Sequence, residues 1–272
     1  MDRAMEPAVL ESKLSESETK FLWVFGYGSL CYKPGFEFNK AILGFVNGFQ
    51  RRFWQGNVTH RGTKEQPGRV ATLIEDSDGV VHGVAYAISG EAAIPYLNHR
   101  ECQQGGYIAK IVDFHSEKGQ LEIAILITKS RFYISRIPGE CFKVMIYVAC
   151  PANEHWLGDS EIDDIAGEII SSKGPSGHNV EYLIRLAEFM RLHFPGKHDA
   201  HLFSLEDRVL ALVKENQMCL DTLMGSGEGC ITFIRRANSR ETSPTQDRRN
   251  GRQDTFEGTT EGSSSRLRCL NI

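Results

Sequence analysis

The chain has 272 residues, of which 41% are hydrophobic and 10% aromatic, and its formal net charge is −4 at pH 7. This composition suits a soluble globular core, and the negative charge argues against a dedicated nucleic-acid binder, which usually carries a basic stripe. No apolar run approaches the roughly 20 residues that a membrane-spanning helix needs.

Both ends of the chain differ in composition from its middle. Residues 1–20 are polar and mixed in charge, so they lack the apolar core of a secretory signal and predict a disordered leader. Residues 218–272 are polar and end in a stretch rich in Arg, Ser, Thr and Gly, which cannot bury enough apolar surface to offset the entropy of ordering. We therefore expect one folded domain over residues 21–217, followed by a disordered tail.

The seven cysteines indicate the redox environment. They are odd in number, widely scattered and contain no Cys-x-x-Cys pair. That pattern favours reduced thiols over a disulfide framework or a zinc site. We expect a cytosolic protein.

The first predicted strand, residues 22–25, ends abruptly in the sequence Gly-Tyr-Gly-Ser. Two glycines around one aromatic let the backbone turn sharply and expose its N–H groups, because glycine tolerates conformations closed to other residues. Such a loop can present amide donors to a carboxylate or a phosphate. An ordinary turn from strand to loop is an equally good interpretation of these residues alone.

Further strands are predicted in the first half of the chain, over residues 41–53, 69–74, 80–88, 108–114 and 142–148. The sequence Asp76-Ser77-Asp78-Gly79 lies between two of them and predicts a hairpin turn. Helices are predicted over 160–171, with Ser160 as N-cap, and over 180–192 and 202–215. Strands followed by a helical end favour an α+β fold with a mixed, barrel-like sheet.

A second informative stretch runs from Tyr96 to Tyr107 and precedes the predicted strand 108–114. It places Glu101 at the end of a short helical pattern, close to the turn Gly105-Gly106. A carboxylate there can be held near a pocket while the glycines let a substrate approach the backbone. A solvated helical charge is the competing interpretation, since short motifs alone are weak.

Several segments occur together in one order along the chain: Gly26-Tyr27-Gly28-Ser29-Leu30, then Arg51-Arg52-Phe53-Trp54-Gln55-Gly56, then Pro67-Gly68-Arg69-Val70, then Tyr96 to Tyr107, then Gly174-Pro175-Ser176-Gly177 with Asn179, Glu181 and Tyr182. This series resembles the ChaC-type gamma-glutamylcyclotransferases, the glutathione-specific branch of the cyclotransferase fold. The resemblance covers roughly residues 23–205.

The resemblance implies a small mixed β-barrel with packed helices. It also implies a lyase that cleaves glutathione to 5-oxoproline and cysteinylglycine, without a metal or another cofactor. Glu101 matches the family's catalytic glutamate, and the loop from Tyr27 to Leu30 matches the segment that binds the gamma-glutamyl group. The remaining candidates for substrate binding are Phe25, Gly26, Arg52, Arg69, Tyr107 and Tyr182.

Two features depart from the family pattern. Residues of about 119–138 form an apolar, β-prone extra segment, which is either a genuine hairpin or extra sequence left by alternative processing of the message. The tail after residue 217 does not resemble a family core. Two alternatives to glutathione cleavage therefore stay open: a cyclotransferase acting on other gamma-glutamyl compounds, or a non-catalytic protein that binds glutathione or gamma-glutamyl groups.

Overall fold

The computed structural model describes residues 22–88, 95, 97, 99, 101, 106–117, 123–127, 130–132, 139, 141–227, 230–231 and 233–235. The predicted leader and residues 236–272 of the predicted tail lie outside these ranges.

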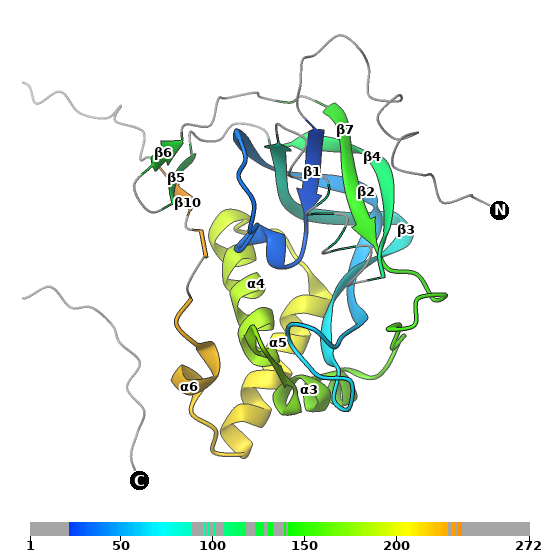
Figure 1. Ribbon diagram of the computed structural model, residues 1–272, viewed down its shortest axis with the longest axis vertical. Helices are drawn as coiled ribbons and strands as arrows, with labels where there is room; N and C mark the ends of the chain where they lie inside the picture. The colour runs from blue at the N-terminus through cyan, green and yellow to red at the C-terminus, as the bar shows by residue number, and fades with distance from the viewer. Residues whose placement is uncertain are drawn as a thin grey trace, which may run out of the picture. The chain divides into compact units, whose positions relative to one another are not determined.

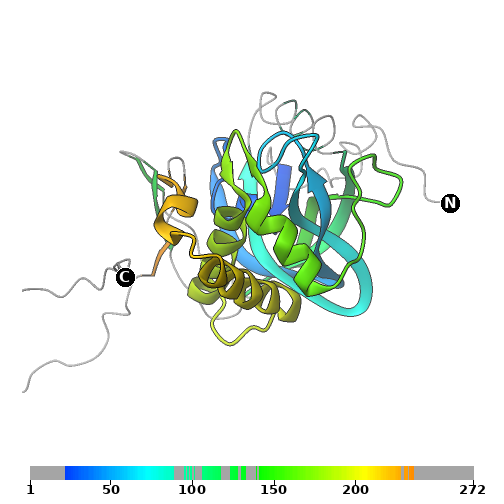
Figure 2. The same ribbon diagram turned by 90° about the horizontal axis from the view of Figure 1, so that it is seen from below.

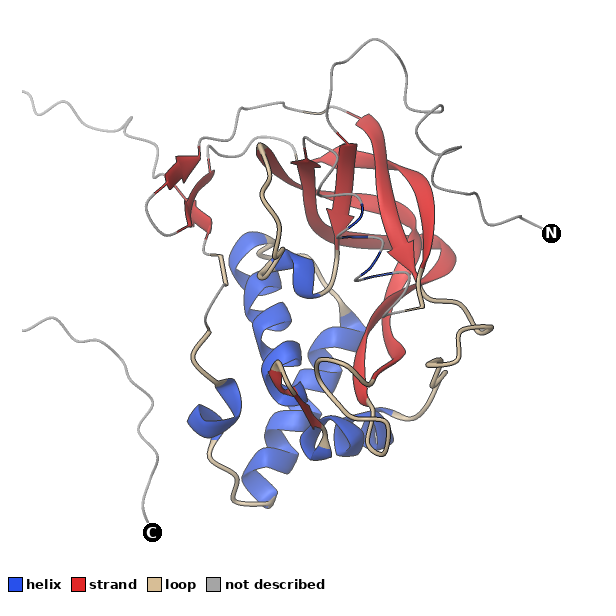
Figure 3. Ribbon diagram, in the orientation of Figure 1, coloured by secondary structure: helices blue, strands red, loops and turns tan. Residues whose placement is uncertain are grey.

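Five strands form a closed barrel, as the sequence pattern predicts (Figures 1 and 3). They are β1 (Leu22–Gly26), β2 (Lys40–Asn57), β3 (Gly68–Ile88), β4 (Ile108–Ser116) and β7 (Cys141–Val148). Their order around the barrel is β1-β3-β2-β4-β7, and the parallel pairing of β7 with β1 at Val24 and Met145 closes it. The other neighbours are antiparallel. The fully buried side chains of Phe25 and Phe114 pack together, with ring centroids 5.7 Å apart. Tyr86 points to the opposite face of β3, where its hydroxyl donates to the Leu30 carbonyl at 2.7 Å.

The predicted hairpin at residues 76–79 is wrong, because β3 runs through it without a reversal. The pairing with β2 holds on both sides, at Phe49 with Glu75 and at Asn47 with Val80. The residues between form a bulge opposite one residue of β2, in which the Asp76 side chain accepts the Asp78 N–H at 3.0 Å. This local bond satisfies the turn-forming residues without ending the strand. The real reversal between β2 and β3 lies at residues 58–67.

Three long helices follow the barrel and pack against the ends of β2 and β3 (Figure 2). They are α3 (Ile162–Ser171), α4 (Asn179–His193) and α5 (Ala200–Glu215). The short strands β8 (Lys173–Gly174) and β9 (Gly177–His178) pair just before α4. The predicted N-cap of α3 is wrong by one residue. Glu161 occupies that position, while the Ser160 hydroxyl bonds to the Asp164 side chain at 3.3 Å instead.

Helix α4 buries the apolar face that its sequence period predicts. Leu183, Leu186, Phe189 and Met190 are all buried in the common core. The same helix also buries the polar residues Asn179 and Glu181 near its start. These polar residues stand on the side of α4 that faces the loop between β2 and β3.

Several elements lie in the extra segment and beyond residue 217. Backbone strands β5 (Ile123–Ile127) and β6 (Ser130–Phe132) pair antiparallel, and β10 (Phe233–Arg235) pairs with β5. Helix α6 (Leu220–Met224) buries Leu223, so ordered contacts extend past the predicted domain end. No helix in the described part of the chain is long and apolar enough to cross a membrane.

Candidate active site

Two adjoining cavities lie beside the loop that follows β1. The larger has a volume of about 210 Å³ and the smaller about 40 Å³. Four residues line both of them: Ser29, Glu101, Tyr107 and Tyr182. The structure thus brings Glu101 to the loop that the sequence singles out.

The loop after β1 turns into η1 (Ser29–Cys31), a single 3-10 turn held by the bond from the Cys31 N–H to the Gly28 carbonyl at 3.0 Å. The first amides of a helical turn have no carbonyl of that turn to bond, so such a loop directs donors outward. Gly28 is needed for a close approach: a Cβ there would lie 2.7 Å from the Tyr182 Oη. The loop backbone therefore lies directly against the hydroxyl of Tyr182.

Tyr27 is buried in the wall of the smaller cavity. Its hydroxyl donates a hydrogen bond to the Tyr147 carbonyl, and its own carbonyl accepts one from the Arg51 Nε at 2.9 Å. Burial raises the pKa of Tyr27 well above its usual value, and the charges of Tyr182 and Glu101 raise it further. Tyr27 is therefore a neutral hydrogen-bond donor at physiological pH.

Two tyrosines that line both cavities bond to the same residue of β3, Ala71. The Tyr182 hydroxyl accepts the Ala71 N–H at 3.1 Å, and the Tyr107 hydroxyl donates to the Ala71 carbonyl at 3.3 Å. Burial raises the pKa of Tyr182 to about 12, and the charge of Glu101 contributes to that rise. Glu101, Tyr107 and Tyr182 line both cavities together.

Glu101 itself is half-buried. Its backbone carbonyl accepts the Tyr107 N–H at 3.0 Å, which fixes the loop just before β4. A carboxylate set partly out of water among neutral hydroxyls and exposed to a cavity is suited to exchanging protons with a bound molecule.

The larger cavity carries basic side chains that sequence reasoning missed. Lys33 and Arg61 both line it, together with His60, Asn57 and Ser176. Arg61 is only 7% exposed. Its Nη1 donates to the Glu181 Oε2 at 2.7 Å and to the His178 carbonyl at 3.0 Å. The turn Gly174-Pro175-Ser176-Gly177 lies beside the larger cavity, which Ser176 lines.

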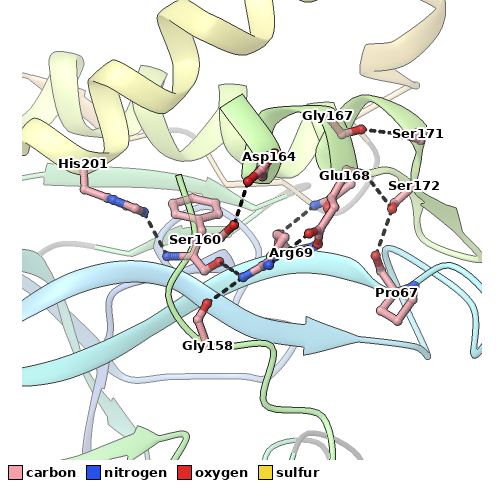
Figure 4. Close-up of polar contacts among 12 residues, drawn as sticks. Pro67, Arg69, Gly158, Ser160, Asp164, Gly167, Glu168, Ser171, Ser172 and His201 are labelled. Atoms are coloured by element: carbon pink, nitrogen blue, oxygen red, sulfur yellow. Dashed lines mark hydrogen bonds and ion pairs between the residues drawn. The ribbon is translucent and has the colours of Figure 1, made fainter. Parts of the chain in front are cut away.

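Most of the predicted binding residues line these cavities, namely Phe25, Tyr27, Gly28, Ser29, Leu30, Tyr107 and Tyr182. Gly26, Arg52 and Arg69 line neither of the two. The Arg69 guanidinium pairs with Glu168, at 2.6 and 3.0 Å, and donates to the Gly158 carbonyl at 2.8 Å (Figure 4). Arg52 donates to the Arg51 carbonyl at 3.0 Å and bonds to the Gln50 side chain.

The described residues contain no group of three or more His, Cys, Asp or Glu side chains placed to hold a metal ion. Five of the cysteines lie in the described ranges, and no disulfide joins them. The buried Cys31 has its pKa raised to about 12 by burial, so its thiol is protonated and inert.

Comparisons with known proteins agree with this architecture. The model of the ChaC-like protein family matches residues 22–212. Glutathione-specific gamma-glutamylcyclotransferase 1 of Danio rerio is 42% identical over 196 residues, covering 71% of this chain and 91% of the relative. The Homo sapiens protein of the same name is 41% identical over 198 residues, covering 72% and 81%. A crystal structure of the glutathione-specific gamma-glutamylcyclotransferase from yeast superposes with a TM-score of 0.59 at 32% identity, covering 71% of this chain and 97% of that one. This chain belongs to the ChaC-like family.

Proposed function

We propose that this protein is a glutathione-specific gamma-glutamylcyclotransferase, a lyase that releases 5-oxoproline and cysteinylglycine from glutathione. The observation that carries the proposal is the position of Glu101, which lines both cavities together with the loop after β1. Support also comes from the names of relatives that are 41–42% identical to this chain.

The two cavities suggest how the substrate lies. The smaller one, walled by Tyr27, Gly28 and Leu30, takes the gamma-glutamyl group. The larger one takes cysteinylglycine, whose terminal carboxylate is ionised at neutral pH. Lys33 and Arg61 supply the positive charge that this carboxylate needs. An arginine that is nearly buried is suited to a carboxylate because its fork of N–H donors matches the two oxygens.

The reaction is intramolecular. The α-amine of the glutamyl group attacks its own γ-carbonyl carbon, which forms the C–N bond of a five-membered lactam, and the C–N bond to cysteine then breaks. No water molecule is consumed. Because both reacting groups belong to one molecule, the main task of the protein is to fold the substrate into an attack geometry. Such orientation is worth roughly 7–11 kcal/mol in well-arranged cases.

Glu101 moves the protons. The α-amine is an ammonium group in water, so a base must deprotonate it before it can attack. Glu101 accepts protons from the attacking nitrogen and passes them to the departing nitrogen of cysteinylglycine, so the carboxylate is regenerated at the end. Tyr27 and Tyr182 do not compete as bases, since their raised pKa values keep them protonated.

The amides of the loop have one of two roles. The N–H groups of Gly28, Ser29 and Leu30 hold the α-carboxylate of the substrate, or they stabilise the oxyanion that forms on the γ-carbon. Preorganised donors of this kind serve either purpose. Both roles require the turn that η1 provides.

A substrate panel tests the proposal. Purified full-length protein is incubated with glutathione, gamma-glutamyl-alanine and gamma-glutamyl-lysine, and 5-oxoproline is measured by chromatography. We expect release from glutathione alone. Equal turnover of the other two compounds would identify a cyclotransferase of broader range. Binding of glutathione without any release would identify a non-catalytic binding protein and overturn the proposal.

A further inference from the structure

Residues after α5 pack against the core and against α4. We call the described residues 218–227 and 230–231, which include α6, the C-terminal strap. They lie beyond the region that the family model matches, residues 22–212. Leu223 is buried, and Met218, Leu220, Met224, Cys230 and Ile231 pack against the core. Figure 1 shows α6 beside α4, with which it makes direct contact.

A chain of charged side chains connects this strap to the cavity wall. The Arg185 Nη2 donates to the Met224 carbonyl at 3.1 Å, and its Nε donates to the Glu181 Oε1 at 2.8 Å. The other oxygen of Glu181 accepts the Arg61 Nη1 at 2.7 Å. The Glu181 carboxylate is thus held between two guanidinium groups, one facing the strap and one lining the cavity.

A second contact reaches Tyr32, which also lines the larger cavity. The Ile231 N–H donates to the Tyr32 carbonyl at 2.7 Å, next to the cavity-lining Lys33. The strap also passes very close to Arg185: a Cβ on Gly227 would lie 2.9 Å from the Arg185 Nη2, and Gly227 has a φ of +69°. Only glycine fits readily at such a position.

Burial restricts the orientations that the side chains of the charged chain can adopt. The side chains of Glu181 and Arg61 are 7% and 8% exposed, so neither can turn to water without losing a charge partner. A buried carboxylate that must satisfy two guanidiniums has one orientation that serves both. Fixing Arg185 to the strap therefore fixes Glu181, and Glu181 in turn fixes Arg61.

We propose that the C-terminal strap positions the residues that bind the dipeptide end of the substrate, with Arg185 as the positioning residue that acts through Glu181 on Arg61. This inference rests on the proposed function, in which Arg61 and Lys33 face the glycine carboxylate. Glu101 and the loop after β1 are not part of the charged chain of Arg185, Glu181 and Arg61. Breaking the charged chain at Arg185 should therefore weaken substrate binding without slowing the chemical step.

Arg185→Gln in the full-length protein is the first test, with Arg208→Gln as its control. Glu181 keeps Arg61 as a partner in the first variant, which spares the fold. Arg208 pairs only with the exposed side chains of Asp163 and Glu215 among the described residues. We expect Arg185→Gln to raise KM for glutathione about tenfold with kcat within about twofold, as loss of one charge-assisted bond predicts. Arg208→Gln should change neither. Unchanged KM in Arg185→Gln, or a fall in kcat alone, would overturn the inference.

Ile231→Pro tests the second contact, because proline lacks the N–H that Tyr32 accepts. Ile231→Val keeps that N–H and is the matched control. KM should rise in the proline variant and stay unchanged in the valine variant. Equal KM values in these two variants would contradict a role of the bond between Ile231 and Tyr32 in positioning the substrate-binding residues.

Hydrogen–deuterium exchange separates this inference from the proposed function, since it needs no substrate. The N–H groups of His60 and Arg61 both donate to the Asn57 side chain, at 2.8 and 2.7 Å. We expect Arg185→Gln to speed exchange in a peptide that covers residues 57–62, and Arg208→Gln to leave it at the wild-type rate. Equal exchange in all three proteins would overturn the strap's positioning role. Absence of 5-oxoproline release by the wild type would overturn only the proposed function.

Discussion

Arg51 on β2 donates a hydrogen bond from its Nε to the carbonyl oxygen of Tyr27, at 2.9 Å, in the middle of the loop that follows β1. The same guanidinium is fully buried and forms an ion pair with Asp199. Asp199 caps α5 by accepting the Leu202 N–H at 3.1 Å. The buried Arg51 side chain therefore connects the loop after β1 to the start of α5, where Asp199 lies 148 residues after Arg51 in the sequence.

This tie predicts that Asp199→Asn destabilises the protein. Asparagine caps a helix about as well as aspartate, so the cap survives, but Arg51 is left as a buried charge without its ionic partner. We expect the free energy of unfolding to fall by about 3 kcal/mol, as for other buried pairs that lose one member. Urea denaturation measures this change. Asp163→Asn removes an exposed pair with Arg208 and should leave the free energy of unfolding nearly unchanged. Equal costs in the two variants would contradict a structural role for the buried pair.

The close approach of Gly28 to Tyr182 predicts coupling between them. A Cβ at Gly28 would collide with the Tyr182 hydroxyl, so Gly28→Ala should displace the tyrosine and reduce kcat/KM. Tyr182→Phe removes that oxygen together with its bond to the Ala71 N–H, at a cost of about 1 kcal/mol in stability. The double variant should recover part of the loss caused by Gly28→Ala. A double-mutant cycle on kcat/KM should give a coupling energy between Gly28 and Tyr182 of about 0.5–3 kcal/mol. Strictly additive effects on kcat/KM would argue against the contact.

Stability should fall on mild acidification because of histidines that are held neutral. Burial lowers the pKa of His201 from its usual 6.5 to about 4, and its Nε2 accepts the Phe53 N–H at 3.1 Å. Burial also lowers the pKa of His82 to about 4. A group whose pKa is depressed in the folded state binds protons more readily when unfolded. The stabilising effect is therefore present above pH 6.5 and is lost as the pH falls toward 4.

His201→Gln isolates one of these contributions. The glutamine amide oxygen can still accept the Phe53 N–H but does not titrate. Between pH 7 and pH 5 we expect the wild type to lose about 1–2 kcal/mol more unfolding free energy than this variant. Urea denaturation at the two pH values measures the difference. Equal losses would show that His201 does not titrate upon unfolding in this range.

The sequence predicted the barrel strands and long helices because their signals are local. Alternation and the helical period place Phe25, Phe114 and Leu183 on buried faces regardless of what they later contact. The pairing of Glu101 with the loop after β1 came from the resemblance to a family, since the two segments are joined only by the fold. The hairpin at Asp76 failed because the long pairing with β2 outweighed local turn chemistry.

The polar network of the larger cavity was missed for a related reason. Arg61 meets Glu181 across 120 residues of sequence, and no local pattern marks either as a partner. Arg69 was predicted to bind substrate, but it lines neither cavity. It pairs instead with Glu168, which lies 99 residues away in the sequence and which no local pattern marks as its partner. The role of a charged residue depends on its neighbours in the folded structure. The periodicity of apolar residues, in contrast, can be recognised within a single segment of the sequence. The position of Arg61 in a turn-rich loop beside Gly62 is only weak evidence that it lines a binding site.

Turnover of glutathione by Glu101→Gln is the most direct test of Glu101 as the group that moves protons. The amide has nearly the same shape as the carboxylate but cannot accept a proton at neutral pH. Glutathione binding, measured by calorimetry, should therefore stay within a few-fold of wild type, whereas the rate of 5-oxoproline release should fall by about 10²–10⁴. Release at the wild-type rate by a correctly folded Glu101→Gln protein would contradict the mechanism.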